Sequence, residues 1–250
     1  MSVFGEYERR VAEILGGIPT KTLAIKLDGM RPKGFHGAAV VDHLLASLDE
    51  ACWKAPSHSV ESNWQWRTRL PEMPPSSPEV GLERAICKVD GLQSWSFQMS
   101  TCSGLRGKHS DKRRAIDLVR DFGAGHFAFI ELKVESDNPL YAAFEILGYY
   151  LAFLRARAHG HSASASHDVM KAIRVDLAVV GTDGWYEFSP SRGAPKRRIN
   201  LDWLCDDLTE GIQQLSIGHP KTALRFEGYP ASMNQQAQAC FIISRFRPPY

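Results

Sequence analysis

Apolar and polar residues follow one another in a pattern that predicts both helices and strands between residues 78 and 190. Ser77 can cap a helix whose first residue is Pro78, and Gly91 supplies a stop, so we predict a helix over residues 78–90. The stretches "SWSFQMST", "AIDLVRDF" and "HFAFIELKV" then alternate like strands, with "GAG" as the turn between the last two. These three strands are expected to form a meander.

A long helix and two further strands are predicted next. After Asn138, "NPLYAAFEILGYYLAFLRARA" repeats apolar residues at helical spacing, and Pro139 suits the first turn. "AIRVDLAVVGT" is an apolar run typical of a strand buried on both faces, and "TDG" turns it into a last strand, "WYEFSP". Further on, "LDWLCDDLTEGIQQL" favours a helix, whereas the apolar "CFIISRF" is less informative.

The pattern over the first 77 residues predicts a helical region with loops. "EYERRVAEIL" and "AAVVDHLLASLDEACW" both carry apolar residues at helical spacing. The region ends in "LPEMPPSSP", whose prolines and serines break a helix and make a plausible junction. We therefore divide the chain into an N-terminal helical region, residues 1–77, and a domain with a C-terminal extension, residues 78–250.

Composition sets only broad bounds on function. A formal charge of +2 over 250 residues neither requires nor excludes a polyanionic partner. The five cysteines are far apart and form no metal clip or evident disulfide framework, which suggests a reducing compartment. The N-terminus does not resemble a signal sequence, and no apolar run reaches the ~20 residues that span a bilayer. We expect a cytoplasmic protein without a membrane partner.

The strands predicted to be buried contain three charged residues: Asp117, Glu131 and Lys133. If the turn centres on Ala124, antiparallel partners have numbers that sum to 248, so Asp117 faces Glu131 with the Cβ atoms ~5 Å apart. Two carboxylates at that distance repel each other unless a positive charge lies between them, and a divalent cation such as Mg²⁺ would supply it.

Lys133 lies two residues beyond Glu131, so strand alternation places it on the same face, beside the expected ion. Its ammonium can orient a metal-bound water or help to deprotonate it, and can offset charge that develops on a phosphate. Together the three residues indicate metal-assisted hydrolysis of a phosphodiester.

These residues resemble the signature of the PD-(D/E)XK nuclease superfamily, which has the restriction-endonuclease-like fold. The likeness covers roughly residues 78–190 and rests mostly on "AIDLV" and "FIELKV". The common core of that superfamily is helix, three strands, helix, strand, the order predicted above. The resemblance implies an α/β fold, a three-layer α/β/α arrangement with a mixed, mainly five-stranded sheet, plus the N-terminal helical region.

Carried over by position, Asp117 and Glu131 would bind Mg²⁺, with Mn²⁺ as a substitute, and Lys133 would be the catalytic lysine. Glu83, in the helix before the meander, matches an acidic residue that many members add to the metal site, and Glu79 is its rival one turn earlier. The Pro that often precedes the Asp is replaced by Ile116.

The crossover helix carries a further likeness. A subset of exonuclease-like members has Gln-x-x-x-Tyr there, and the matching positions in this chain are Glu145 and Tyr149. Glu in place of Gln is a departure, and it could supply a further carboxylate to the metal site. Tyr149 is a candidate for nucleic-acid contact, with burial in the core as the competing interpretation.

Other residues suggest nucleic-acid contacts more weakly. A basic loop precedes the Asp strand and could touch a phosphate backbone or could simply be solvated; it includes Arg106, Lys108, Arg113 and Arg114. Trp64 and Trp66 stand among arginines, a composition compatible with base stacking, although such tryptophans more often pack in a core. Three histidines in a Ser-rich loop lack metal-site spacing: His159, His161 and His167.

The resemblance implies a Mg²⁺-dependent deoxyribonuclease, with DNA a better candidate substrate than RNA and a role in restriction, repair or phage defence. A homodimer or a partner protein is compatible with it, because cutting both strands of a duplex often requires two sites. The alternative is a catalytically inactive module of the same fold that binds nucleic acid or a protein. Degenerate members usually lose the Asp, the Glu or the Lys, and this sequence retains all of them.

Overall fold

The helix before the meander begins and ends where its sequence predicts. In the computed structural model of the chain, α4 spans Pro78–Asp90, and the Ser77 side chain accepts a hydrogen bond from the backbone N–H of Val80. Gly91 follows with a φ of 86°, a conformation that glycine adopts at little cost because it has no Cβ. Local signals at both ends therefore account for this helix.

The structure describes residues 9–11, 13, 34–52, 64–101, 115–134, 139–158, 168–188, 194–215 and 218–247. Most of the predicted first helix, "EYERRVAEIL", lies outside these ranges. So do the residues of the predicted basic loop and the three histidines of the Ser-rich loop, namely Arg106, Lys108, Arg113, Arg114, His159, His161 and His167.

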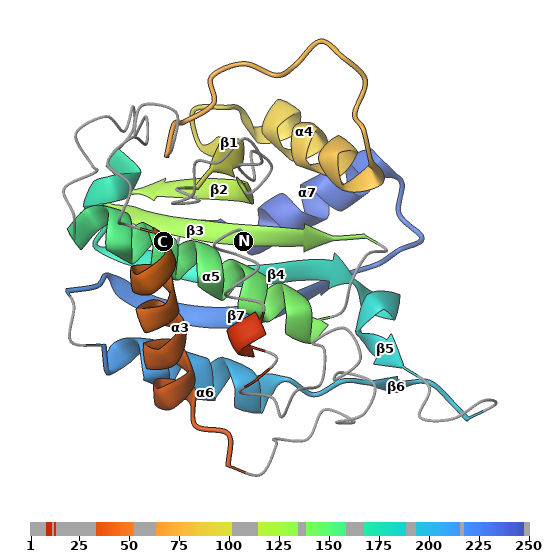
Figure 1. Ribbon diagram of the computed structural model, residues 1–250. Helices are drawn as coiled ribbons and strands as arrows, with labels where there is room; N and C mark the ends of the chain where they lie inside the picture. Colours follow the sequence, from red (N-terminus) through yellow and green to blue (C-terminus); the bar gives the residue numbers. More distant parts are fainter. Residues whose placement is uncertain are drawn as a thin grey trace.

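The predicted meander is present and contributes three strands to a five-stranded sheet (Figure 1). Strand β1 (Trp95–Ser100) pairs antiparallel with β2 (Ala115–Gly123), and β2 pairs antiparallel with β3 (His126–Lys133). Ala124 and Gly125 turn β2 into β3 with φ angles of 51° and 73°, and positive φ at both positions is what a tight hairpin turn requires.

The register of this hairpin matches the sequence prediction. Leu118 pairs with Ile130 and Asp121 pairs with Phe127, so partner numbers sum to 248 as expected. A register shift between Asp121 and Gly123 absorbs the extra residue next to the turn. The cross-strand partners in the hairpin are therefore the predicted ones.

The remaining two strands run parallel to β3, which makes the whole sheet mixed. Strand β4 (Arg174–Thr182) pairs with β3, and β7 (Lys221–Tyr229) pairs with β4, giving the order β1-β2-β3-β4-β7. The crossover helices are α5 (Pro139–Ala158) and α6 (Asp202–Gln213). In the described part of the chain no helix is both long and apolar enough to cross a membrane.

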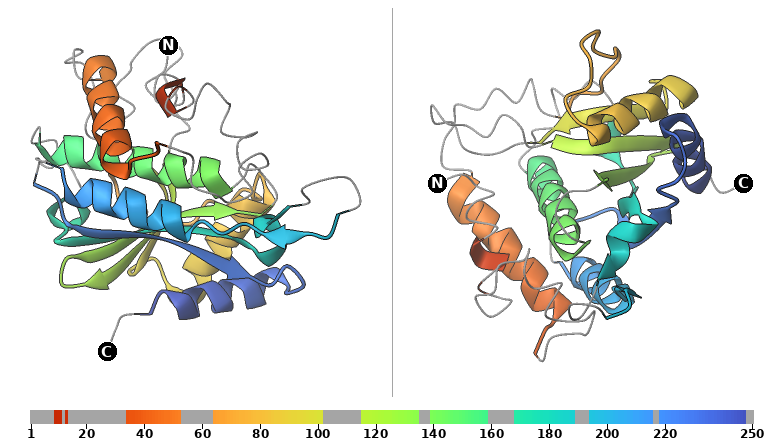
Figure 2. Two further views of the ribbon diagram at one scale, coloured as in Figure 1. Left: turned by 90° about the horizontal axis from the view of Figure 1, so that it is seen from below. Right: turned by 90° about the vertical axis from the view of Figure 1, so that its right-hand side faces the viewer.

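Helices cover both faces of the sheet, so the predicted three-layer α/β/α fold is confirmed. Helices α5 and α6 lie on one face, and α4 and α7 (Gln235–Arg245) lie on the other (Figure 2). Helix α3 (Gly37–Cys52), predicted within the N-terminal region, packs against α6 and α5 on their outer side. Two hydrophobic clusters fill the spaces between sheet and helices, one on each face.

The fifth strand of the sheet is not the one that the sequence predicted. Of residues 185–188, the described part of "WYEFSP", only Glu187–Phe188 is a strand, β5, and it pairs with β6 (Arg197–Arg198) in a separate two-stranded sheet. Asp183–Tyr186 is a 3₁₀ turn, η4, and the Tyr186 hydroxyl donates to the carbonyls of β4 and β7. The aromatic residues thus cap the sheet instead of extending it, and β7 takes the fifth place. The apolar "CFIISRF" lies mostly in α7.

The tryptophans at residues 64 and 66 are packing residues. Trp64 is 1% exposed and Trp66 is 8% exposed, and both belong to the hydrophobic cluster on the α5 face. The Trp66 indole also donates a hydrogen bond to the Leu92 carbonyl, 2.7 Å away. Neither ring is presented for base stacking, so the competing interpretation of these residues as core is confirmed.

Candidate active site

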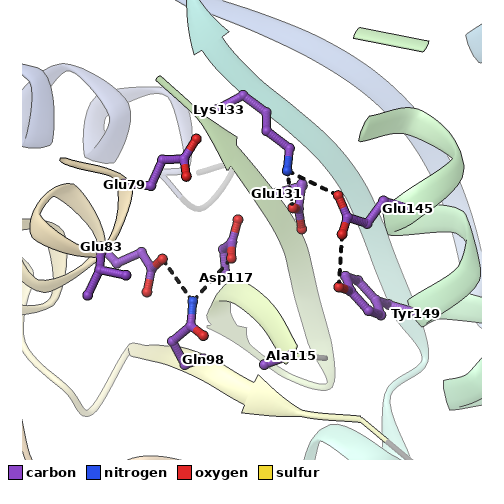
Figure 3. A pocket seen from close by; sticks show the side chains of 10 residues that line it. Glu79, Glu83, Gln98, Ala115, Asp117, Glu131, Lys133, Glu145 and Tyr149 are labelled. Atoms are coloured by element: carbon purple, nitrogen blue, oxygen red, sulfur yellow. Dashed lines mark hydrogen bonds and ion pairs between the residues drawn. The ribbon is translucent and has the colours of Figure 1, made fainter. Parts of the chain in front are cut away.

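A cavity of about 330 Å³ opens at the end of the β2–β3 hairpin that lies away from its turn. Its lining comes from both helical layers and from three adjacent strands, as Figure 3 shows. The residues are Glu79, Val80 and Glu83 of α4, Gln98 of β1, Ala115 and Asp117 of β2, Glu131 and Lys133 of β3, and Glu145 and Tyr149 of α5.

Asp117 lies where β2 and β3 cease to pair. The last pair on this side of the ladder is Leu118 with Ile130, so Asp117 and Glu131 are the next residues in register. Asp117 Oδ2 accepts a hydrogen bond of 2.9 Å from the backbone N–H of Leu132, which holds the carboxylate against β3. Burial raises the pKa of Asp117 to about 6, although the Lys133 ammonium and the Leu132 N–H both act to lower it.

Lys133 joins two of the predicted carboxylates. Its Nζ lies 2.8 Å from Glu131 Oε1 and 3.0 Å from Glu145 Oε2, and the Tyr149 hydroxyl donates to Glu145 Oε1 over 3.2 Å. Burial alone lowers the pKa of Lys133, but the surrounding carboxylates of Glu131, Glu145 and Asp117 more than offset this and raise it. Lys133 is therefore an ammonium at neutral pH.

Glu131 is the most enclosed carboxylate of the hairpin, at 3% exposure. Burial raises its pKa well above the usual range, and the nearby carboxylates of Asp117 and Glu145 raise it further. The ion pair with Lys133 opposes both effects but does not cancel them. The carboxylates of Asp117 and Glu145 thus both lie near Glu131, and the single Lys133 ammonium does not offset their effect on its pKa.

Glu83 reaches the cavity from the opposite helical layer. Its side chain is 1% exposed, and Glu83 Oε1 accepts a hydrogen bond of 2.9 Å from Gln98 Nε2. Burial, together with the Asp117 carboxylate, raises the pKa of Glu83 to about 9. Its rival Glu79 also lines the cavity but accepts a hydrogen bond from the backbone N–H of Val134. Glu83 is therefore the one joined to Asp117 through a shared partner.

That shared partner is Gln98, a site residue that the sequence analysis missed. Gln98 Nε2 also donates to Asp117 Oδ1 over 3.1 Å, so one amide connects α4 to β2. The signal available in the sequence was a polar residue between Phe97 and Met99 in the first strand of the meander. To predict that Gln98 lies beside Asp117, one must know the register of β1 against β2. The connection between these strands is long, so the sequence does not determine that register.

The lining has the chemistry of a cation site. Five carboxyl groups face one ammonium, and hard divalent cations prefer carboxylate oxygens. Among the described residues, Glu83 Oε2 and Glu131 Oε2 are buried without a hydrogen-bond partner, a costly state for a carboxylate. A divalent ion bound to these oxygens would remove that cost.

The side chains are not yet arranged around an ion. Within the described ranges, no three His, Cys, Asp or Glu side chains converge closely enough to hold one. Lys133 and Gln98 instead lie between the carboxylates and hydrogen-bond them in pairs (Figure 3). Binding an ion would require these carboxylates to turn their unpartnered oxygens towards one another.

The structure brings together every predicted site residue that it describes, namely Asp117, Glu131, Lys133, Glu83, Glu145 and Tyr149. Tyr149 is 3% exposed, so its ring is largely core while its hydroxyl reaches the site. No protein-family model, no curated protein and no solved structure matches the chain.

Proposed function

We propose that this chain is a metal-dependent nuclease that hydrolyses phosphodiester bonds in DNA, as its resemblance to the PD-(D/E)XK superfamily implies. One observation carries the proposal. Asp117, Glu131 and Lys133 meet at an open cavity that also holds Glu83 and Glu145, and two buried carboxylate oxygens there have no hydrogen-bond partner among the described residues.

In this proposal Asp117, Glu131 and Glu83 hold Mg²⁺ or Mn²⁺. Such an ion activates a bound water and neutralises charge on the phosphate when it is bound. A phosphate backbone is itself negative and would meet five carboxyl groups in this cavity, so a bound divalent ion would favour its entry. DNA binding at this cavity is therefore expected to depend on the divalent ion.

Lys133 would stabilise negative charge in the transition state. Its raised pKa keeps the side chain protonated, so it donates a hydrogen bond to the attacking water or to a phosphate oxygen and does not take up a proton. Glu145 fixes the position of the ammonium, and the Tyr149 hydroxyl fixes Glu145 in turn. A role in restriction, repair or phage defence, action in the cytoplasm, and a homodimer or a partner protein belong to the same proposal.

The test is cleavage of linear and circular DNA, single- and double-stranded, with RNA alongside, in Mg²⁺, Mn²⁺ or EDTA. We expect metal-dependent cleavage of DNA by the wild type. Lys133→Met should reduce cleavage by at least about 100-fold, the usual loss when a group that stabilises transition-state charge is removed. The matched control is Lys171→Met, which removes a lysine whose side chain is 81% exposed.

The result that overturns the proposal is a well-folded wild type that cuts none of these substrates in either metal. Equal cleavage by Lys133→Met and Lys171→Met would also contradict it. In the first case the inactive binding module becomes the better account, and retention of DNA or RNA by the uncleaving protein in a gel-shift assay would support that account.

A further inference from the structure

The Gln98 amide connects two elements that approach the cavity from different layers of the fold. Its Nε2 donates to Glu83 Oε1 of α4 over 2.9 Å and to Asp117 Oδ1 of β2 over 3.1 Å. An amide NH₂ has two hydrogens, so it can make both bonds at once. The two carboxylates are held as a pair by one neutral side chain (Figure 3).

The backbone at Gln98 is unusual for a strand. Gln98 has a φ of 46°, in the left-handed region that costs a non-glycine residue energy and that clusters at functional sites. Phe97 packs in the cluster beneath α4, whereas Met99, two residues on, packs in the cluster on the α5 face. In a regular strand those two side chains share a face, so β1 turns over at Gln98.

Neighbouring residues hold this irregular backbone in place. The Gln98 carbonyl accepts a hydrogen bond of 3.2 Å from Arg67 Nε, and the Arg67 backbone N–H donates to Ser96 Oγ. The Trp64 backbone N–H donates to the Ser100 carbonyl on the same edge of β1. The segment before α4 therefore covers the edge of β1 on both sides of Gln98 and fixes the direction of its side chain.

Asp117 and Glu83 depend on this link to different degrees. Asp117 is also held by the Leu132 backbone N–H, so the sheet itself positions it. Glu83 is fully enclosed, and its second oxygen has no hydrogen-bond partner among the described residues. Among the described residues, the Gln98 amide is the hydrogen-bond partner that ties the Glu83 carboxyl group to the sheet.

We propose that Gln98 is a positioning residue that makes Glu83 part of the ion-binding site by holding it at a fixed distance from Asp117. This inference rests on the proposed function, since it concerns the same metal ion. Gln98 would act through Glu83, so removing either residue should remove the same contribution to ion binding. Partners that orient metal ligands usually contribute 10- to 100-fold to metal affinity.

The test is a double-mutant cycle read out as Mn²⁺ affinity, measured by titration calorimetry on the full chain without substrate. We expect Gln98→Leu and Glu83→Gln each to weaken Mn²⁺ binding by about 10- to 100-fold. The double variant should bind no more weakly than the weaker single variant, because both changes remove one contribution. Gln236→Leu, on the exposed surface of α7, is the matched control and should bind like the wild type.

A second variant distinguishes loss of the bridging hydrogen bonds from a defect in folding. Gln98→Asn keeps an amide and suits the left-handed backbone, but it is one methylene too short to bridge both carboxylates. We expect Gln98→Asn to melt at or above the wild-type temperature and yet to bind Mn²⁺ as weakly as Gln98→Leu does. Wild-type Mn²⁺ affinity in Gln98→Asn would overturn the inference. So would a double variant in which the fold-losses in Mn²⁺ affinity of the two single variants multiply.

The outcomes for this inference and for the proposed function are separable. A wild type that binds no Mn²⁺ contradicts the metal site itself and therefore both proposals. A wild type that binds and cleaves, with Gln98 variants that bind equally well, leaves the nuclease proposal standing and removes the role of Gln98.

Discussion

At the residue scale, Glu83 illustrates the energetic cost of a site whose charges are not balanced. A carboxylic acid whose pKa is raised by folding holds its proton more tightly in the folded state than in the unfolded chain. Its contribution to stability is therefore complete below the unfolded pKa, about 4.5, and is lost as the pH rises through the folded pKa of about 9. In the absence of metal the folded protein should become less stable across this range.

We predict that Glu83→Gln stabilises the metal-free protein at pH 8.5 and has much less effect at pH 4.5. The amide keeps the shape of the side chain and an oxygen for Gln98, but it has no proton to lose. The gain should be about 1–3 kcal/mol, the range for relieving a buried polar group without a partner. Urea unfolding in EDTA at the two pH values measures it.

The matched control for that experiment is Glu72→Gln, a change of the same chemistry at an exposed position. Its free energy of unfolding should follow the wild type at both pH values. If the difference in free energy of unfolding between the wild type and Glu83→Gln is the same at pH 4.5 and pH 8.5, the raised pKa of Glu83 is contradicted. A stabilised Glu83→Gln with reduced Mn²⁺ affinity would mean that the residue is kept for function at a cost in stability.

At the element scale, two helices approach closely enough to require glycine. A Cβ on Gly211 of α6 would lie 2.5 Å from the carbonyl oxygen of Gly37, at the start of α3. A Cβ on Gly37 would in turn meet the backbone of Asp207. The obstacles are main-chain atoms that cannot rotate away, so α3 and α6 pack with their backbones in contact.

We predict that Gly211→Ala destabilises the protein. Alanine favours a helix interior by about 1 kcal/mol over glycine, but overpacking against a fixed backbone costs about 1–3 kcal/mol or more. The clash should therefore win, and thermal unfolding should shift to lower temperature. Gly184→Ala is the control, because a Cβ there meets nothing within 4 Å. A more stable Gly211→Ala would show that α3 is free to move away from α6.

The elements that could be predicted from the sequence are those with local signals. Helix α4 has a cap, a proline and a glycine within its own span, and the β2–β3 register follows from a two-residue turn. Strand β7 has no such signal, because it pairs with β4 across a crossover of some forty residues and is only half buried. The register of β1 also depends on a long connection, which is why the place of Gln98 beside Asp117 could not be predicted.

At the scale of the whole molecule, the cavity joins parts of the fold that are otherwise separate. Glu83 comes from the helical layer on one face of the sheet, Glu145 from the layer on the other face, and the hairpin residues lie between them. An ion bound by these carboxylates would link α4 to the sheet. Ion binding should therefore stabilise the global fold as well as the site.

We predict that Mg²⁺ or Mn²⁺ raises the melting temperature of the wild type and leaves Asp117→Asn/Glu131→Gln unchanged. An ion that binds only the folded state at 100 times its dissociation constant adds about 2.7 kcal/mol. For a chain of 250 residues each kcal/mol shifts the melting temperature by about 2–4 °C, so the expected rise is about 5–10 °C. The double variant should show no response to metal, and its melting temperature in EDTA is the reference for that comparison. An equal rise in the melting temperature of both proteins would mean that the ion binds elsewhere on the chain. If millimolar metal does not raise the melting temperature of the wild type, a site that couples the two helical layers is contradicted.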